Sequence, residues 1–341
     1  MKWLMLFLAL VMTACSRPQP AGVTTLTYAS PYPPTHPFSR ADLTWIAFVE
    51  QRSHGTLKIK PIWSGALLSS DMSMEELRHG VADIGLITPI YVKGGTHLIR
   101  IQSGFASGAD SVESQAALYR CIAAGNPQID RELAGLQVLA VQGGNLPGIV
   151  TRDKPVRSLA DLKGMRLRAP TELLTVLQTL GADPVNMPMG QVYSAMAKGV
   201  IDGVIAPGDT FKSMHFAEIA RNYTSLSVPR GAYPARAMGA RRWATLNAEQ
   251  RQILLEGVAV WEAALAKEVR GALSTGFAEA TKARVQMIAM PPGEQARFDA
   301  LYLRDAAQNA RELLALGIDG PGSFATARSS IHGRDQIGCG L

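Results

Sequence analysis

The feature that most constrains the fold of this chain is an order of predicted elements that occurs twice. Runs in which apolar and polar residues alternate, or short wholly apolar runs, favour strands, whereas apolar residues repeated about every 3.6 positions favour helices. Each half therefore reads strand, helix, strand, helix, strand: 24–29, 40–52, 57–62, 73–79 and 83–87, then 165–168, 171–180, 185–187, 191–198 and 202–205. Strands that alternate with helices predict a parallel sheet, so the chain is expected to contain two α/β lobes.

The turns that close the two halves also match. Gly80-Val81-Ala82-Asp83 stands at the same step as Gly199-Val200-Ile201-Asp202, and Pro89 and Pro207 follow the last strand of each half. Glycine is favoured at this position because helices commonly end in a residue of left-handed conformation. A match at the same step of two similar units indicates a duplicated architecture.

The rest of the chain is predicted to be mainly helical. Asn247 to Lys282 is one long helix, opened by a capping box of Asn247 and Gln250, and it is long enough to cross between two lobes. Residues 285–289 favour a strand and residues 291–316 a helix. We expect lobe I to comprise 23–146 and about 231–272, lobe II 147–230 and about 273–319, and 320–341 to be an irregular tail rich in glycine and serine.

The N-terminus predicts export. Met1-Lys2 is followed by an apolar run to Met12, which is too short to span a bilayer, and then by Thr13-Ala14 and Cys15. A small residue directly before a cysteine resembles the bacterial lipoprotein box, in which the cysteine becomes lipidated. We therefore expect residues 1–22 to be a lipoprotein signal and tether, Cys15 to carry a lipid, and the protein to be periplasmic. Simple secretion with cleavage near Ala14 is the alternative.

Composition excludes several classes of function. The net charge is +6, but the basic residues are scattered, so a nucleic-acid footprint is not expected. The six histidines lie far apart and no Cys-x-x-Cys occurs, so we expect no metal site and no cofactor. Cys121 and Cys339 can pair in an oxidising compartment, although sequence does not establish that they are close. Recognisable catalytic motifs are absent, which favours binding over catalysis.

Three segments carry a specific family resemblance. They contain D-L-K-G-M-R-L-R-A-P (161–170), G-A-D-P-V-N-M-P-M-G-Q-V-Y-S-A (181–195) and G-V-I-D-G (199–203). Together they resemble the substrate-binding proteins of TRAP (tripartite ATP-independent periplasmic) transporters. The resemblance implies a two-lobed periplasmic binding protein of α/β class, with two parallel-core sheets, flanking helices and a long connecting helix. It also implies an organic carboxylate as ligand and an integral membrane TRAP permease as partner.

Arg168 is the principal candidate for binding that carboxylate. Strand alternation turns Arg166 and Arg168 to one side, and Arg168 ends the strand, where open α/β sheets place their ligands. A guanidinium offers a planar fork that matches a carboxylate. The family's central arginine matches Arg168, whereas Arg166 is expected on the surface.

Further candidates come from position and from the resemblance. They are Thr88, Met189, Asn145, Asp209, Thr210, Tyr32 and His36. Core packing is the alternative for Met189, and loop surface is the alternative for Tyr32 and His36. Trp63 and Tyr233 are possible wall residues, although core packing is favoured for both.

Two departures from the family pattern bear on the ligand. Val204-Ile205-Ala206 replaces a polar Q-E-N segment that contacts ligand or metal in many relatives, and Gly148 stands where sialic-acid-type relatives have a second arginine. A different and more apolar ligand follows from these replacements. A binding protein that serves a sensor kinase, or an exported enzyme on the same scaffold, remains an alternative function.

Overall fold

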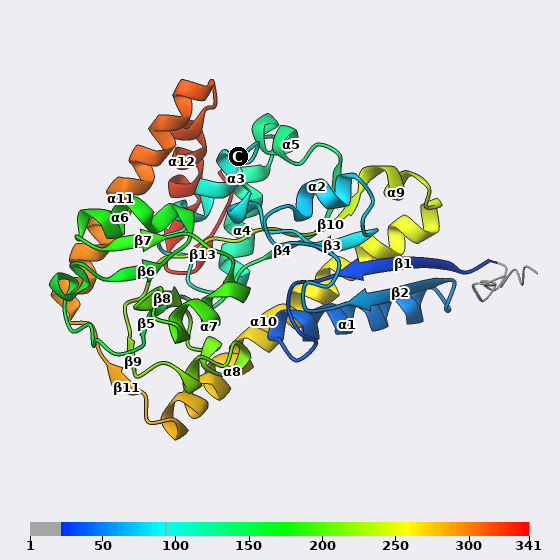
Figure 1. The fold of residues 1–341 in the computed structure, drawn as a ribbon. Coiled ribbons are helices and arrows are strands. Elements are labelled where there is room, and N and C mark those ends of the chain that lie inside the picture. The colour runs from blue at the N-terminus through cyan, green and yellow to red at the C-terminus, as the bar shows by residue number, and fades with distance from the viewer. Residues whose placement is uncertain (1–21, 93, 341) are drawn as a thin grey trace, which may run out of the picture.

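The computed structural model describes residues 22–92 and 94–340 and contains two large sheets flanked by helices (Figure 1). The strand order of the first sheet is β2 (Leu57–Ile62), β1 (Thr24–Ala29), β3 (Ile84–Leu86), β10 (Tyr233–Gly239) and β4 (Leu136–Gln142). The order of the second is β11 (Gln286–Ile288), β9 (Asn222–Thr224), β5 (Gly148–Thr151), β8 (Gly203–Ala206), β6 (Arg166–Arg168) and β7 (Asp183–Val185). We call lobe I the first sheet with the helices packed on it, and lobe II the second.

Each sheet has a parallel core, as the repeated element order predicted. In lobe I β1 lies between β2 and β3 and is parallel to both, and in lobe II β6 lies in the same way between β7 and β8. One antiparallel strand then joins each core: β10 in lobe I and β5 in lobe II. Neither of these two strands was predicted from the sequence.

The helices flank both sheets. They are α1 (Pro37–Arg52), α2 (Ser73–Arg78), α3 (Leu98–Ile101), α4 (Val112–Ala123), α5 (Pro127–Glu132), α6 (Leu174–Thr179), α7 (Met189–Ala197), α8 (Thr210–Ser213), α9 (Ala240–Ala244), α10 (Ala248–Lys282), α11 (Pro292–Glu312) and α12 (Gly320–Ser329). None of the helices in the described ranges combines the length and the apolarity needed to span a bilayer. Predicted boundaries were off by up to four residues. The largest error is the end of α11 at Glu312, which a 3₁₀ turn (Leu313–Leu316) continues, and α1 begins at Pro37, with His36 as its N-cap.

The repeated Gly-Val-x-Asp turns have the same backbone structure in both lobes. Gly80 and Gly199 have φ values of 78° and 71°, in the left-handed region that favours glycine. Val81 and Val200 each donate the backbone N–H to a carbonyl five residues earlier, at 2.9 and 2.8 Å. This is a Schellman helix end, which explains why the same residues recur.

The aspartate of each turn links the turn to the middle strand of the parallel core, β1 in lobe I and β6 in lobe II. Asp83 Oδ2 accepts the N–H of Thr27 at 2.7 Å in lobe I, and Asp202 Oδ2 accepts the N–H of Arg166 at 2.7 Å in lobe II. The aspartates are therefore structural residues on the side of each sheet away from the carboxyl ends of its strands.

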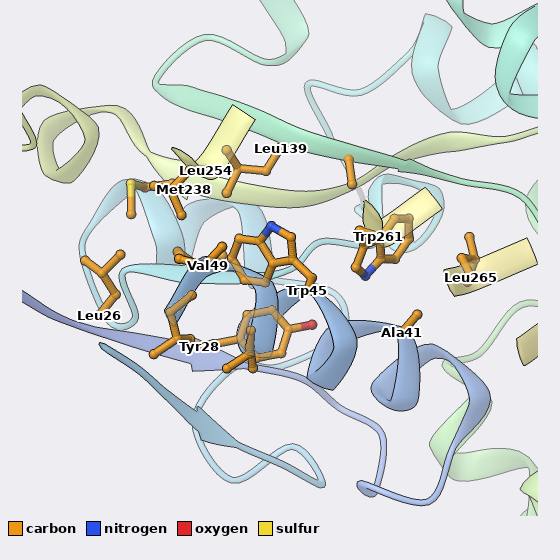
Figure 2. Close-up of a cluster of buried hydrophobic side chains, with 14 of the residues drawn as sticks. Leu26, Tyr28, Ala41, Trp45, Val49, Leu139, Met238, Leu254, Trp261 and Leu265 are labelled. Atoms are coloured by element: carbon orange, nitrogen blue, oxygen red, sulfur yellow. The ribbon is translucent and has the colours of Figure 1, made fainter. Parts of the chain in front are cut away.

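The core of lobe I lies between its sheet and the helices α1 and α10 (Figure 2). Tyr28 of β1, Trp45 of α1 and Trp261 of α10 are buried in it. Asp42, at the centre of this core, pairs with Arg236 of β10 at 2.7 Å and accepts the indole N–H of Trp261 at 2.8 Å. A buried ion pair thus joins α1, α10 and the antiparallel strand.

Two helices connect the lobes. The N-terminal part of α10 packs on α1 in lobe I, and its C-terminal part contacts α8 in lobe II, as expected for a long connecting helix. The other is α11: Phe298 and Tyr302 lie in a lobe II cluster, whereas Ala306 and Ala310 pack with α3 and α4 of lobe I.

The expectation of an irregular tail over 320–341 was wrong. This segment forms α12 and a hairpin of β12 (Ile331–Gly333) and β13 (Gln336–Ile337), and Cys339 forms a disulfide with Cys121 of α4. Glycine and serine gave weak local helix signals, but burial of Ala327 and the packing of Phe324 on Phe105 order the segment. The predicted signal, tether and lipid site at Cys15 lie outside the described residues, except for residue 22.

Candidate ligand-binding site

Two of the segments that carry the chain from one sheet to the other meet at one cavity. Residues 143–147 join β4 to β5, and residues 225–232 join β9 to β10. The cavity has a volume of about 100 Å³, measured over positions open to the centre of a water molecule. One water needs roughly 10–15 Å³ by that measure, so the cavity has room for a small organic molecule.

Both lobes and both crossing segments line this cavity. They include Tyr32, His36, Phe38, Tyr91 and Ser103 from lobe I, Arg168, Glu172, Met189, Ile205, Ala206, Asp209 and Thr210 from lobe II, and Gly144, Asn145, Arg230 and Tyr233 from the crossings and the start of β10. Seven of the eight residues predicted as ligand contacts are therefore brought to one place.

Arg168 lies at the carboxyl end of β6 with only 4% of its surface exposed. Its Nε donates to the carbonyl of Met187 at 3.0 Å, and its Nη2 donates to the hydroxyl of Tyr91 at 2.6 Å. Because Tyr91 belongs to lobe I, this second bond crosses from one lobe to the other. Arg166 is exposed and pairs with Asp183 at 3.5 Å, in agreement with its expected surface position.

No carboxylate within the described part of the chain lies at ion-pair distance from Arg168. Within the same residues, the Nη1 atom of Arg168 has no hydrogen-bond partner. Arginine stays charged at all relevant pH values, and a buried charge without a counter-charge is costly. The site is therefore built to receive an anion, and the Nη1 side of the guanidinium remains available for it.

The lobe I wall of the cavity is aromatic. The Tyr32 ring stacks on the His36 ring, with centroids 4.1 Å apart and planes 19° apart, and Phe38 packs edge-on against both. His36 Nδ1 accepts the N–H of Phe38 at 3.2 Å, which leaves the ring proton on Nε2. Burial, with smaller effects from the charges of Arg40 and Arg236, lowers the pKa of His36 to about 3, so the ring is neutral at physiological pH.

The lobe II wall beside Arg168 is largely apolar. Met189 begins α7, and Ile205 and Ala206 end β8, and all three line the cavity. The segment that replaces the polar Q-E-N of many relatives therefore contributes hydrocarbon to the wall. Thr210 also lines the cavity, but its hydroxyl already donates to the carbonyl of Pro207 at 2.6 Å.

Asn145 and Asp209 form a hydrogen-bonded pair on the cavity wall. Asn145 Nδ2 donates to Asp209 Oδ1 and to the carbonyl of Val269, both at 3.0 Å. Asn145 was predicted as a ligand contact; its two amide hydrogens are already used in these bonds, which leaves its side-chain oxygen. Burial raises the pKa of Asp209, opposed by its bond from Asn145 and by the charge of Arg230.

Thr88 is the predicted contact that does not line the cavity. It is 3% exposed, and its hydroxyl donates to the carbonyl of Ser70 at 2.9 Å. It precedes the 3₁₀ turn Pro89–Tyr91 and so helps to place Tyr91. Of the two possible wall residues, Tyr233 lines the cavity, whereas Trp63 packs on Tyr28 in the core of lobe I.

Tyr91, Glu172 and Arg230 line the cavity but were not predicted from the sequence. Tyr91 could have been found from Pro89, since the repeat places that proline after the last strand of lobe I. Glu172 is four residues after Arg168, so its closeness in sequence to the principal candidate could have indicated it. Arg230 has no local signal, because it reaches the cavity only through the path of the second crossing.

Comparisons with known proteins agree with this architecture. A family model described as bacterial extracellular solute-binding protein, family 7, matches residues 28–310. A solute-binding protein of Albidiferax ferrireducens is 28% identical over 184 residues, which is 52% of this chain and 53% of that protein. The chain spans about half the length of this and the next curated relatives that it matches.

Solved structures share the fold over nearly the whole chain. A TRAP solute-binding protein of Rhodoferax ferrireducens, in complex with copurified benzoate, has a TM-score of 0.81 at 23% identity and covers 90% of this chain and 97% of its own. One from Chromohalobacter salexigens with bound D-glucuronate has a TM-score of 0.78 at 16% identity, covering 89% and 99%. These likenesses establish the two-lobed fold and leave the ligand open. By the match of the family model over most of its length, the chain belongs to the bacterial extracellular solute-binding protein family 7.

Proposed function

We propose that this protein captures a small organic carboxylate with an apolar body in the periplasm and delivers it to the integral membrane permease of a TRAP transporter. The observation that carries the proposal is the buried guanidinium of Arg168, which lacks an acidic partner in the described residues and faces a largely apolar cavity between the lobes. The carboxylate of the ligand would form an ion pair with Arg168. Tyr32, His36 and Phe38 would cover the apolar body.

The character of the wall favours an apolar acid over a sugar acid. A sugar acid such as D-glucuronate carries hydroxyl groups that need hydrogen-bond partners when they are buried. Ile205, Ala206 and Met189 cannot supply them, and the amide hydrogens of Asn145 are already used. Benzoate, which the Rhodoferax ferrireducens structure contains, is the kind of acid that this wall suits better.

Delivery to a permease requires the lobes to close on the ligand and open again. The two crossing segments at 143–147 and 225–232 are the places where the lobes can hinge. The bond from Arg168 to Tyr91 joins the lobes directly at the anion site. Ligand binding and closure would therefore use the same side chain.

We also propose that the mature protein is held at the membrane by a lipid on Cys15. The motif before Cys15 supports the anchor, and the disulfide between Cys121 and Cys339 fits an oxidising compartment. Mass spectrometry of the mature N-terminus tests it. A diacylglyceryl-modified Cys15 is expected, whereas an unmodified N-terminus beyond Cys15 would exclude the anchor.

The ligand proposal is tested by a thermal-shift screen of organic acids followed by calorimetry. A ligand at 100 times its Kd should stabilise the fold by about 2.7 kcal/mol and raise the melting temperature. We expect aromatic and other apolar carboxylates to be the strongest hits, with one ligand bound per chain. Release of a chemically altered product would support the exported enzyme instead. Binding of neutral analogues as tightly as of the acids would contradict the role of Arg168.

A further inference from the structure

Helix α9 is a part of lobe I that the proposed function does not use. It has five residues, none of them buried, and it presents Arg241, Arg242 and Trp243 at the surface. A surface helix of a globular protein usually buries an apolar stripe. The Trp243 ring packs only partly against the core, so the outer face of α9 is open to a contact.

Helix α9 lies beside the start of the first strand (Figure 1). Arg242 Nη2 donates to the carbonyl of Thr25 at 3.2 Å, and Gln250, in the next helix, donates to the hydroxyl of Thr24 at 2.9 Å. Thr24 stands nine positions after Cys15, and a chain of that length reaches at most about 32 Å. A lipid on Cys15 would therefore hold this end of lobe I close to the membrane surface.

The surface around α9 carries arginines without acidic partners. We define the α9 surface by five residues that lie on α9 or adjoin it: Arg78, Val81, Arg241, Trp243 and Arg251. Arg241 is exposed, and its Nη2 donates to the carbonyl of Arg78 at 2.8 Å. Arg251 donates to the carbonyls of Trp243 and Ala244 at 3.1 and 2.8 Å, with its guanidinium 6.0 Å from the centre of the Trp243 ring. Neither Arg241 nor Arg251 has a carboxylate at ion-pair distance in the described ranges.

The acids near this surface are largely engaged. Glu75 pairs with Arg78 at 2.6 Å, and Asp83 pairs with Arg242 at 2.8 Å. Glu249 is exposed in the first turn of α10, where the positive end of the helix dipole offsets its charge. The charges of Arg241 and Arg251 are therefore left over, and Val81, which is 45% exposed, adds an apolar group to the same surface.

Basic, aromatic and apolar side chains together suit the headgroup region of an anionic bilayer. Each arginine near such a surface favours contact by about fivefold, and tryptophan is favoured at the boundary between headgroups and acyl chains. An attraction of this size binds a free protein weakly. It suffices to orient a tethered protein, because the tether keeps the effective concentration of the two partners high.

We propose that the α9 surface contacts the anionic phospholipids of the membrane to which Cys15 anchors the protein. This inference rests on the proposed lipid anchor and adds to it a fixed orientation. Lobe II lies on the opposite side of the molecule from the start of β1 (Figure 1). It would therefore point away from the bilayer.

Fluorescence quenching in vesicles tests the proposal. The lipidated protein is reconstituted with a phosphatidylcholine that carries a nitroxide on its headgroup, in vesicles with or without phosphatidylglycerol. The signal of Trp243 is the difference between the native protein and Trp243→Phe, because the other tryptophans are common to both. We expect it to be quenched about threefold or more strongly when phosphatidylglycerol is present, and this difference should vanish at high salt.

Charge variants separate this contact from general attraction to the membrane. Arg241→Gln with Arg251→Gln should shift the equilibrium about tenfold or more toward the orientation that is free of the bilayer. Arg241→Lys with Arg251→Lys keeps both charges and should retain the quenching. Lys198→Gln with Arg221→Gln removes two exposed charges from lobe II and should leave the quenching unchanged. Circular dichroism and melting temperature check that each variant is folded.

The outcomes distinguish this inference from the lipid anchor. Equal quenching in neutral and anionic vesicles, or quenching that survives the double glutamine variant, would overturn the contact and leave the anchor standing. A second copy of the chain on the α9 surface would make the Trp243 emission depend on protein concentration and not on phosphatidylglycerol, which also overturns the contact. If Cys15 carries no lipid, the anchor and this inference fail together.

Discussion

The middle strands of the two parallel cores, β1 in lobe I and β6 in lobe II, pair with their neighbours in the same register. Tyr28 of β1 is paired with Pro61 on one side, and Leu167 of β6 is paired with Pro184 on the corresponding side. One residue earlier in each strand, at Thr27 and Arg166, the backbone N–H donates to the aspartate of the Gly-Val-x-Asp turn. The scaffold is thus repeated in detail.

The next residue of each strand is where the lobes differ. Ala29 ends β1, and Arg168 ends β6 at the equivalent position. The lobe with the alanine instead contributes the aromatic residues Tyr32, His36 and Phe38 from the segment that follows its strand. The two carboxyl edges, built on one plan, therefore supply the two halves of the proposed carboxylate site.

The interiors of the lobes differ as well. Lobe I buries the ion pair of Asp42 and Arg236, with side chains 1% and 4% exposed. Among the described residues, every ion pair within lobe II has at least one partner more than half exposed. Lobe I is therefore expected to be the more sensitive of the two to loss of a charge.

The largest effect is expected from Asp42→Asn. The carboxylate accepts from Arg236 and Trp261, as described above, and from the hydroxyl of Tyr28 at 2.5 Å. Removing its charge leaves Arg236 buried and unpaired, which should lower the free energy of unfolding by about 3–5 kcal/mol in urea denaturation. Asp183→Asn, which breaks the exposed ion pair with Arg166 in lobe II, is the matched control and should cost under about 1 kcal/mol. Equal losses of stability in the two variants would contradict the proposed difference between the interiors of lobe I and lobe II.

The next effect concerns the C-terminal segment, which the disulfide attaches to α4 of lobe I. Cys339→Ser should destabilise the protein by about 2–4 kcal/mol, because opening the link enlarges the unfolded ensemble. A reductant should cause a similar loss in the native protein and no further loss in the variant. An unchanged unfolding midpoint in both experiments would show that packing of α12 holds the segment unaided.

Arg168→Ala makes the end of β6 resemble the end of β1, where Ala29 stands at the equivalent position. We expect the affinity for the best carboxylate to fall by about 30-fold or more, that is by about 2 kcal/mol, since a shielded charge pair is lost. Arg166→Ala, on the same strand but exposed, should change affinity less than about threefold. Calorimetry measures both, and an unchanged affinity in folded Arg168→Ala would remove this residue from the site.

The smallest effect tests the scaffold that the lobes share. Asp83 accepts from the N–H and the hydroxyl of Thr27 and pairs with Arg242 at 2.8 Å, whereas the Asp202 carboxylate accepts only from the N–H of Arg166 within the described residues. Asp83→Ala should therefore cost about 2 kcal/mol and Asp202→Ala about 1 kcal/mol or less. Chemical denaturation compares them, and a larger loss for Asp202→Ala would contradict this account of the turns.

Much of the fold could be predicted because its signals are local. The Gly-Val-x-Asp turns need a left-handed glycine and an aspartate next to a strand, and both requirements are visible in a few residues. The capping box at Asn247 predicted the start of α10 for the same reason. The tail was mispredicted because its helix depends on Phe105 and Cys121, residues more than two hundred positions away.

The sequence by itself determined the repeated scaffold and the candidate anion-binding residue Arg168, because strand period, turn chemistry and a contiguous motif are short-range properties. The tertiary structure decided which side chains share the cavity. It brought in Tyr91 and Arg230, left out Thr88, and engaged the amide hydrogens of Asn145 elsewhere. These contacts form where two crossing segments and a 3₁₀ turn come together in space. No local pattern of residues along the chain indicates which of these segments will be neighbours.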